Sequence, residues 1–195
     1  TSAPYSSGPN NTAIGYQALL NFTTAEDNTA VGMFAGRLLT TGHSNTLLGN
    51  GAGDTMTATS NTVLIGLNAG TAINHTGADG TVAIGRSAGA AITSGASNTV
   101  VGYEAGKSIT TGNHNTAIGY EALDTEDTGG GTVAIGYHAA KAQNGNGKNV
   151  SIGYQASKNG HECEKNVMIG YQAGLSTGGH SWSKNVGIGN DALYK

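Results

Sequence analysis

The chain has 195 residues, 33 of them glycine, and only 11% are charged, against roughly 25% in an ordinary soluble domain. One cysteine excludes an internal disulfide framework, and a formal net charge of −3 excludes a strongly basic nucleic-acid-binding protein and a polybasic membrane patch. No run approaches the roughly 18 apolar residues of a membrane-spanning helix, so we expect no membrane insertion. A glycine-rich, charge-poor composition is typical of low-complexity segments, but the order of the residues indicates otherwise.

The first ten residues form an arm rich in Ser, Pro, Gly and Asn, without the basic start or apolar run of a signal peptide. Such an arm is ordinarily disordered unless something holds it. We therefore expect residues 1–10 to dock on a neighbouring chain, and residues 11–195 to form a single domain.

That domain consists of eleven repeats, each marked by a glycine that we number position 0. The residue at position −1 is always aliphatic, and the residue at position +3 is always alanine. A spacing of 17 residues, extended twice to 19, is too short for paired-helix repeats. The repeat glycines are Gly15, Gly32, Gly49, Gly66, Gly85, Gly102, Gly119, Gly136, Gly153, Gly170 and Gly189.

The segment before each glycine predicts a short β-strand that ends at a glycine corner with a positive φ angle. One strand per repeat, stacked in parallel, predicts an all-β fold, a parallel β-solenoid (β-roll or β-helix) of eleven coils of about 17 residues. Asn at the start of the strand is expected to form a ladder of amide hydrogen bonds between coils. The polar half of each repeat, which holds both insertions, is expected to be a solvent-exposed loop.

Strand alternation places positions −3 and −1 on one side, and their Thr, Val, Ile and Leu residues predict that this side faces inward. The alanines at position +3 predict a second, narrow wall of the same core. Position −2 is then expected to face outward although it is small or apolar, which predicts a covered outer face. The candidate inter-chain interface comprises Leu47, Leu64, Val100 and Met168.

Tyrosine occupies position +1 in five consecutive coils and is expected to stack into a ladder. Two interpretations remain open: packing between coils or chains, and contact with a glycan, since tyrosine combines an apolar ring with a hydroxyl. The residues are Tyr103, Tyr120, Tyr137, Tyr154 and Tyr171.

No catalytic signature accompanies the repeats, because the acidic residues are scattered over loops without a paired acid and base. We expect neither enzymatic activity nor a cofactor. The densest ionisable cluster is residues 161–165, where His161, Cys163 and His180 could form a metal site. We favour a polar loop whose acids neutralise a column of lysines, and assign no metal.

Three segments resemble known repeat arrays: 11–19 (Asn-Thr-Ala-Ile-Gly-Tyr-Gln-Ala-Leu), 115–123 and 132–140. They are similar to the Asn-Thr-Ala-Ile-Gly-Tyr repeats of phage and large-virus fibre proteins and bacterial surface proteins, and to the head repeats of trimeric autotransporter adhesins. The resemblance implies a left-handed coil, three chains packed side by side, and a surface that binds host material. The 17-residue period departs from the shorter adhesin repeat.

These observations lead us to expect a non-enzymatic structural protein of an extracellular fibre, at a cell or virion surface, such as a tail fibre or adhesin. Its partner is expected to be the chain itself, in an end-to-end filament or a homotrimer, with no nucleic-acid partner. The alternative is a surface-binding module that contacts a cell-surface glycan through the tyrosines. Ice binding is the less favoured form of that alternative, because the Thr residues at position −3 are expected to face inward.

Overall fold

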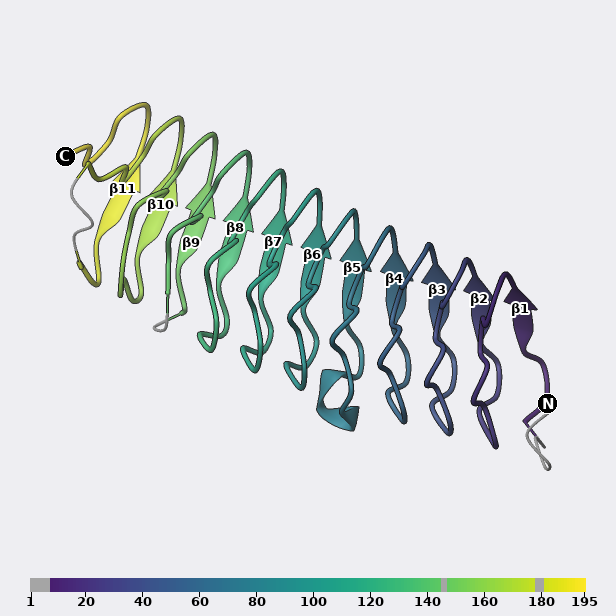
Figure 1. Ribbon diagram of the computed structural model, residues 1–195. Coiled ribbons are helices and arrows are strands. Elements are labelled where there is room, and N and C mark those ends of the chain that lie inside the picture. The colour runs from purple at the N-terminus through teal and green to yellow at the C-terminus, as the bar shows by residue number, and fades with distance from the viewer. Residues whose placement is uncertain (1–7, 145–146, 178–180) are drawn as a thin grey trace.

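A computed structural model describes residues 8–144, 147–177 and 181–195, and it shows a parallel β-solenoid (Figure 1). Eleven three-residue strands form one parallel sheet in chain order. The first strand lies at one end of the rod and the last strand at the other. The described residues contain no α-helix and nothing long and apolar enough to cross a membrane as a helix. The strands are β1 (Thr12–Ile14), β2 (Thr29–Val31), β3 (Thr46–Leu48), β4 (Val63–Ile65), β5 (Val82–Ile84), β6 (Thr99–Val101), β7 (Thr116–Ile118), β8 (Val133–Ile135), β9 (Val150–Ile152), β10 (Val167–Ile169) and β11 (Val186–Ile188).

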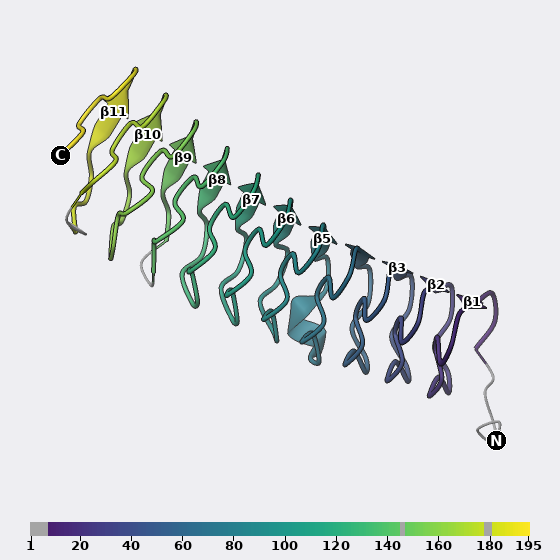
Figure 2. The ribbon, with the colours of Figure 1, turned by 45° about the horizontal axis from the view of Figure 1, so that its top comes forward.

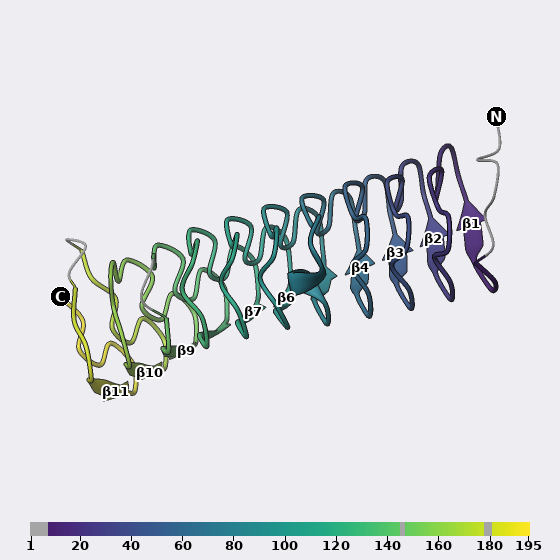
Figure 3. The same ribbon diagram turned by 90° about the horizontal axis from the view of Figure 1, so that it is seen from below.

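The repeat glycines keep the strands in register along the whole rod. Thr99 pairs with Thr116 one period later, and Val63 pairs with Val82 across the first insertion. The insertion leaves the register intact because its extra residues lie in the loop, where the 3₁₀-helix η1 (Thr76–Ala78) forms away from the strands (Figure 2). Seen from below, the strands again follow one another in a single row (Figure 3). The solenoid prediction is confirmed. Most of the arm predicted to dock on a neighbour, residues 1–7, lies outside the described residues.

The predicted inward and outward sides of the strands are reversed in the structure. Side chains at position −2 point into the coil, and those at positions −3 and −1 point out. Leu47, Leu64, Val100 and Met168 are only 0–1% exposed, so they belong to the core and form no inter-chain interface. The inner side therefore carries the Asn or Thr of position −4 and the residue of position −2.

The core is narrow, and positions −2 and +4 share its volume within each coil. All four coils with Leu, Val or Met at position −2 have glycine at position +4. A Cβ atom at Gly70 would lie 2.8 Å from Leu64 Cδ2, and one at Gly106 would lie 2.6 Å from Val100 Cγ1. Conversely, the coils with Leu at position +4 have Ala or Gly at position −2. No coil therefore has a large residue at both positions, because the core lacks room for both.

The alanine column forms the second wall, as predicted. From Ala35 to Ala173 every alanine at position +3 is fully buried. The corner glycines adopt φ values from 127° to 138°, which confirms the predicted positive φ. At Gly119 a Cβ atom would lie 2.4 Å from the carbonyl oxygen of Gly136, so the coils approach too closely for any side chain there.

The predicted asparagine ladder is also present. The amide oxygen of Asn28 accepts from both the backbone N–H and the side-chain amide of Asn45, at 3.0 and 2.9 Å. Where threonine replaces asparagine it still bonds the preceding asparagine, since Thr62 donates its N–H and hydroxyl to Asn45. These bonds satisfy polar groups that would otherwise be buried without partners.

Candidate functional site

The first candidate surface is the outer sheet face, which we define as the residues at positions −3 and −1 of the eleven strands. Neither column contains a charged residue: position −3 is Thr or Val, and position −1 is Ile, Val or Leu. Ile118 in the middle of the rod is 38% exposed, and Ile188 in the last coil is 67% exposed. The two columns run side by side over every coil because the strands are parallel and in register.

This face is large for the surface of a single chain. Eleven strands at a spacing of about 4.8 Å give a length of about 50 Å, and two outward columns give a width of about 10 Å. The resulting area, on the order of 500 Å², lies at the upper end of the largest apolar patches on monomeric proteins. Such a patch is typical of an interaction surface.

The second candidate surface is the tyrosine ladder formed by the five tyrosines at position +1. Consecutive ring centroids are 5.0, 5.4, 5.1 and 5.2 Å apart, with interplanar angles of 6–15°. The guanidinium of Arg86 lies 5.5 Å from the Tyr103 ring centroid and covers one end of the stack. The predicted stacking is thus confirmed. Because each ring covers its neighbour, the ladder presents ring edges and hydroxyl groups to solvent, and four of its members are 41–50% exposed.

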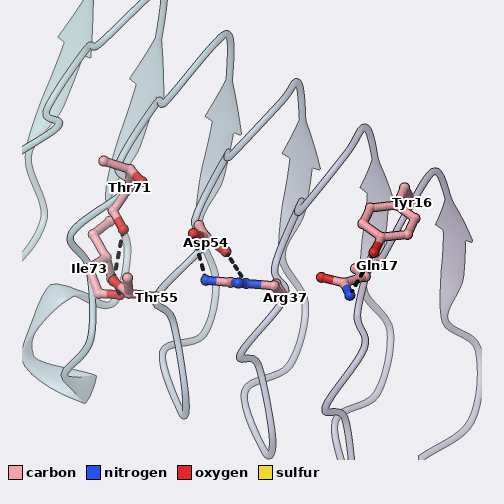
Figure 4. A network of polar contacts seen from close by, with 7 residues as sticks. All are labelled: Tyr16, Gln17, Arg37, Asp54, Thr55, Thr71 and Ile73. Carbon is pink, nitrogen blue, oxygen red and sulfur yellow. Dashed lines mark hydrogen bonds and ion pairs between the residues drawn. The ribbon is translucent and has the colours of Figure 1, made fainter. Parts of the chain in front are cut away.

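A polar column at positions +2 and +5 runs beside the ladder on the wall that follows the corner. At the N-terminal end Arg37 makes a two-pronged ion pair with Asp54 of the next coil, at 2.8 and 3.1 Å (Figure 4). In the same view the side-chain amide of Gln17 donates to the hydroxyl of Tyr16 at 3.2 Å. The column therefore ties neighbouring coils together through side chains.

Along the ladder the same column carries ion pairs that neutralise its carboxylates. Lys107 donates to Glu104 at 2.9 Å, and Lys141 donates to Glu121. These lysines hold the pKa of each glutamate below its usual range. The hydroxyl of Tyr120 hydrogen-bonds Glu121, which raises the pKa of Tyr120.

His138 belongs to this column and packs against the ladder. Its ring centroid lies 3.8 Å from that of Tyr137, and Nε2 is 3.1 Å from the Glu121 carboxylate. Burial lowers the pKa of His138 below its usual value, and the charge of Lys141 lowers it further. The ring is therefore neutral at pH 7.

In the cluster at residues 161–165 an acidic side chain pairs with lysines of two coils, as predicted. Glu164 is paired with Lys165 at 2.6 Å and lies 4.0 Å from Lys148 of the preceding coil. Cys163 is buried, and burial raises the pKa of its thiol. His180, the third residue considered for a metal site, lies outside the described residues. Among those described, no three His, Cys, Asp or Glu side chains gather as metal ligands.

Sequence reasoning identified the tyrosine ladder but missed the outer sheet face. The signal was present in the chain, because the reciprocal sizes of positions −2 and +4 identify the inward residues. Compared with known proteins, the chain matches no family model, no curated protein and no solved structure.

Proposed function

We propose that the chain is a structural, non-enzymatic segment of an extracellular fibre, in which rods associate side by side through the outer sheet face. The observation that carries this proposal is the pair of uncharged columns along all eleven strands, one of them aliphatic throughout and the other composed of Thr and Val. Removing exposed aliphatic side chains from water is favourable by about 25 cal/mol per Å². A patch of this length is stabilised by burial against another surface.

The distribution of charge supports the same function. Ion pairs lie on the wall beyond the corner and on the loops, as with Arg37–Asp54 and Lys165–Glu164, while the two columns of the outer face carry none. Depletion of charge at the centre with a polar surround is the usual composition of a protein interface. The face is also held in place by the sheet and the asparagine ladder, so docking would order few additional groups.

A second copy of the chain is the partner that best fits this face. A surface of Thr, Val, Ile and Leu side chains about 50 Å long fits a partner of similar length and the same strand spacing, and another rod provides both. Three chains around a common axis would bury the face of each against two neighbours. This arrangement agrees with the packing that the repeat resemblance implies.

Ice binding is a second candidate function, favoured by one specific observation. The threonines of position −3, predicted to face inward, lie on the outer face instead, for example Thr99 and Thr116 in adjacent strands. A regular array of hydroxyl and methyl groups on a flat sheet is the surface that ice binding would use. Valine replaces threonine in six of the eleven coils, so self-association remains the proposed function.

The test is the mass of the particle in solution, measured by light scattering over a concentration series. Three chain masses of 19.4 kDa are expected for the wild type, and one for Ile118→Lys, which puts a charge in the centre of the face. Leu20→Lys is the matched control, because Leu20 is an exposed aliphatic residue outside the face. Circular dichroism verifies that each variant keeps its fold.

Three results would overturn the proposal. A wild type of one chain mass at every concentration would show that the face does not self-associate, and inhibition of ice recrystallisation by that monomer would favour ice binding. Long filaments whose mass is unchanged in Ile118→Lys would favour end-to-end stacking. Equal effects of the two lysine variants would assign the loss to charge rather than to the face.

A further inference from the structure

We infer that the tyrosine ladder, together with the polar column beside it, binds an extended neutral polysaccharide that runs along the rod axis. This inference goes beyond the proposed function and does not depend on it, because the two surfaces are different. The outer sheet face precedes the corner glycine of each coil, and the ladder follows it. The ligand class follows from the spacing, the exposed chemical groups and the charge of the surface.

The spacing of the rings suits a ligand that itself repeats. Ring centroids recur every 5.0–5.4 Å over five coils, and each ring is fixed by its neighbours and by the backbone of its coil. The described residues enclose no pocket, so a ligand lies along the open surface. A linear polymer can repeat the same weak contact at each coil, and a rigid array loses little entropy when it binds.

The tyrosines at position +1 are not demanded by the fold. Coils with the same strand and the same corner carry Met33, Asn50, Leu67 and Arg86 at this position. Stacking accounts for the rings being aromatic, but it does not require the phenol hydroxyls that tyrosine adds to phenylalanine. The exposed edges and hydroxyls of the ladder therefore point to a contact outside the coil.

The exposed groups suit sugar hydroxyls. With their faces covered, the rings offer phenol hydroxyls that both donate and accept hydrogen bonds. Glu121, Gln155 and Gln172 at position +2 add carboxylate and amide groups, and Gln172 donates to Gln155 at 3.1 Å. Sugar hydroxyls also donate and accept, so a polysaccharide can satisfy such a mixed row, whereas an apolar ligand cannot.

The charge of the surface favours a neutral polymer. Beside the ladder, positions +2 and +5 hold three carboxylates and three lysines, so their formal charges cancel. His138 between them is neutral at pH 7 because burial lowers its pKa. With no field of one sign along the ladder, neither a polyanion nor a polycation is preferred. The charged residues are Glu104, Glu121 and Asp124, with Lys107, Lys141 and Lys158.

The experiment is affinity electrophoresis in native gels that contain hydroxyethyl cellulose, mixed-linkage β-glucan, galactomannan or dextran. The decisive variant is the triple change Tyr120→Phe, Tyr137→Phe and Tyr154→Phe, which keeps the stacked rings and removes three hydroxyls. Each neutral hydrogen bond contributes roughly a factor of five to affinity, so the triple variant should bind at least about tenfold more weakly. Tyr16→Phe is the control, because Tyr16 lies outside the ladder and should leave retardation unchanged.

The wild type is expected to be retarded by at least one neutral polysaccharide and not by dextran sulfate. Absence of retardation in all four neutral gels would overturn the inference, as would unchanged retardation of the triple variant. Stronger retardation by dextran sulfate would show that charge, not the ladder, binds the polymer. A triple variant that loses particle mass, from a wild type that no gel retards, would assign the ladder to contact between chains. Because Ile118→Lys leaves the ladder intact, its effect on particle mass tests the proposed function separately.

Discussion

Replacing Met168 by alanine and Gly174 by leucine exchanges a large and a small residue across the core of one coil. Met168 occupies position −2 and is buried, and a Cβ atom at Gly174 would lie 2.8 Å from Met168 Cγ and 2.9 Å from its Sδ. The exchanged pair is the arrangement that Ala117 and Leu123 already have three coils earlier. The double variant therefore tests whether positions −2 and +4 share one volume.

Each single change is expected to destabilise the rod. Met168→Ala leaves a cavity and should cost about 3 kcal/mol in free energy of unfolding. Gly174→Leu crowds Met168 and places leucine at a φ of 67°, where natural leucines at this position have values of 48–57°. Crowding and strain together should cost about 3 kcal/mol. In the double variant the leucine fills the cavity, so we expect a favourable coupling of about 2–3 kcal/mol and a total cost of about 3–4 kcal/mol.

The assay is urea unfolding followed by fluorescence of Trp182, the single tryptophan, whose carbonyl accepts from Asn166 at the start of the same coil. Its signal reports on the region of the exchange, which matters because stacked repeats do not always unfold as one unit. Additive costs in the double variant would refute the shared volume. A harmless Met168→Ala would refute the assignment of position −2 to the core.

Two further predictions concern the corner and the ladder. Gly119→Ala should lower the free energy of unfolding by at least about 3 kcal/mol, measured with urea, because strain at a φ of 135° adds to a clash with the next coil. Gly189→Ala is the control: its φ is 127° but nothing lies within 4 Å, so it should show the cost of strain alone, and equal costs would refute the close approach. His138 is held neutral in the fold, so the unfolded chain takes up its proton first as pH falls below the ordinary histidine value of 6.5, and stability present above that pH should be lost below it. Urea midpoints from pH 8 to pH 5 should fall more steeply for the wild type than for His138→Gln, and parallel curves for the two proteins would contradict the reasoning.

The sequence alone predicted much of the fold because the same residue types recur at the same positions of all eleven repeats. The 17-residue spacing, the aliphatic residue before glycine and the constant alanine predicted a one-strand coil with a corner. Asparagine at the strand start predicted the ladder now seen between Asn28 and Asn45. Five tyrosines in one column predicted a stack, because identical positions of parallel coils lie one strand spacing apart.

The alternation of residues within a strand left undecided which side faces the core, and the tertiary structure settled it. Strand alternation shows that Thr116 and Ile118 share a side and that Ala117 has the other, but alternation is the same whichever side is buried. The expectation that the aliphatic side is buried was wrong because the residue at position −4 uses the inner side: Asn115 donates across the coil to the carbonyl of Gly129 at 2.9 Å. Alternation then places Ala117 inside with Asn115 and leaves Ile118 outside. Positions −3 and −1 consequently form an outer face, which no single strand could reveal because it exists only when eleven coils are stacked in register.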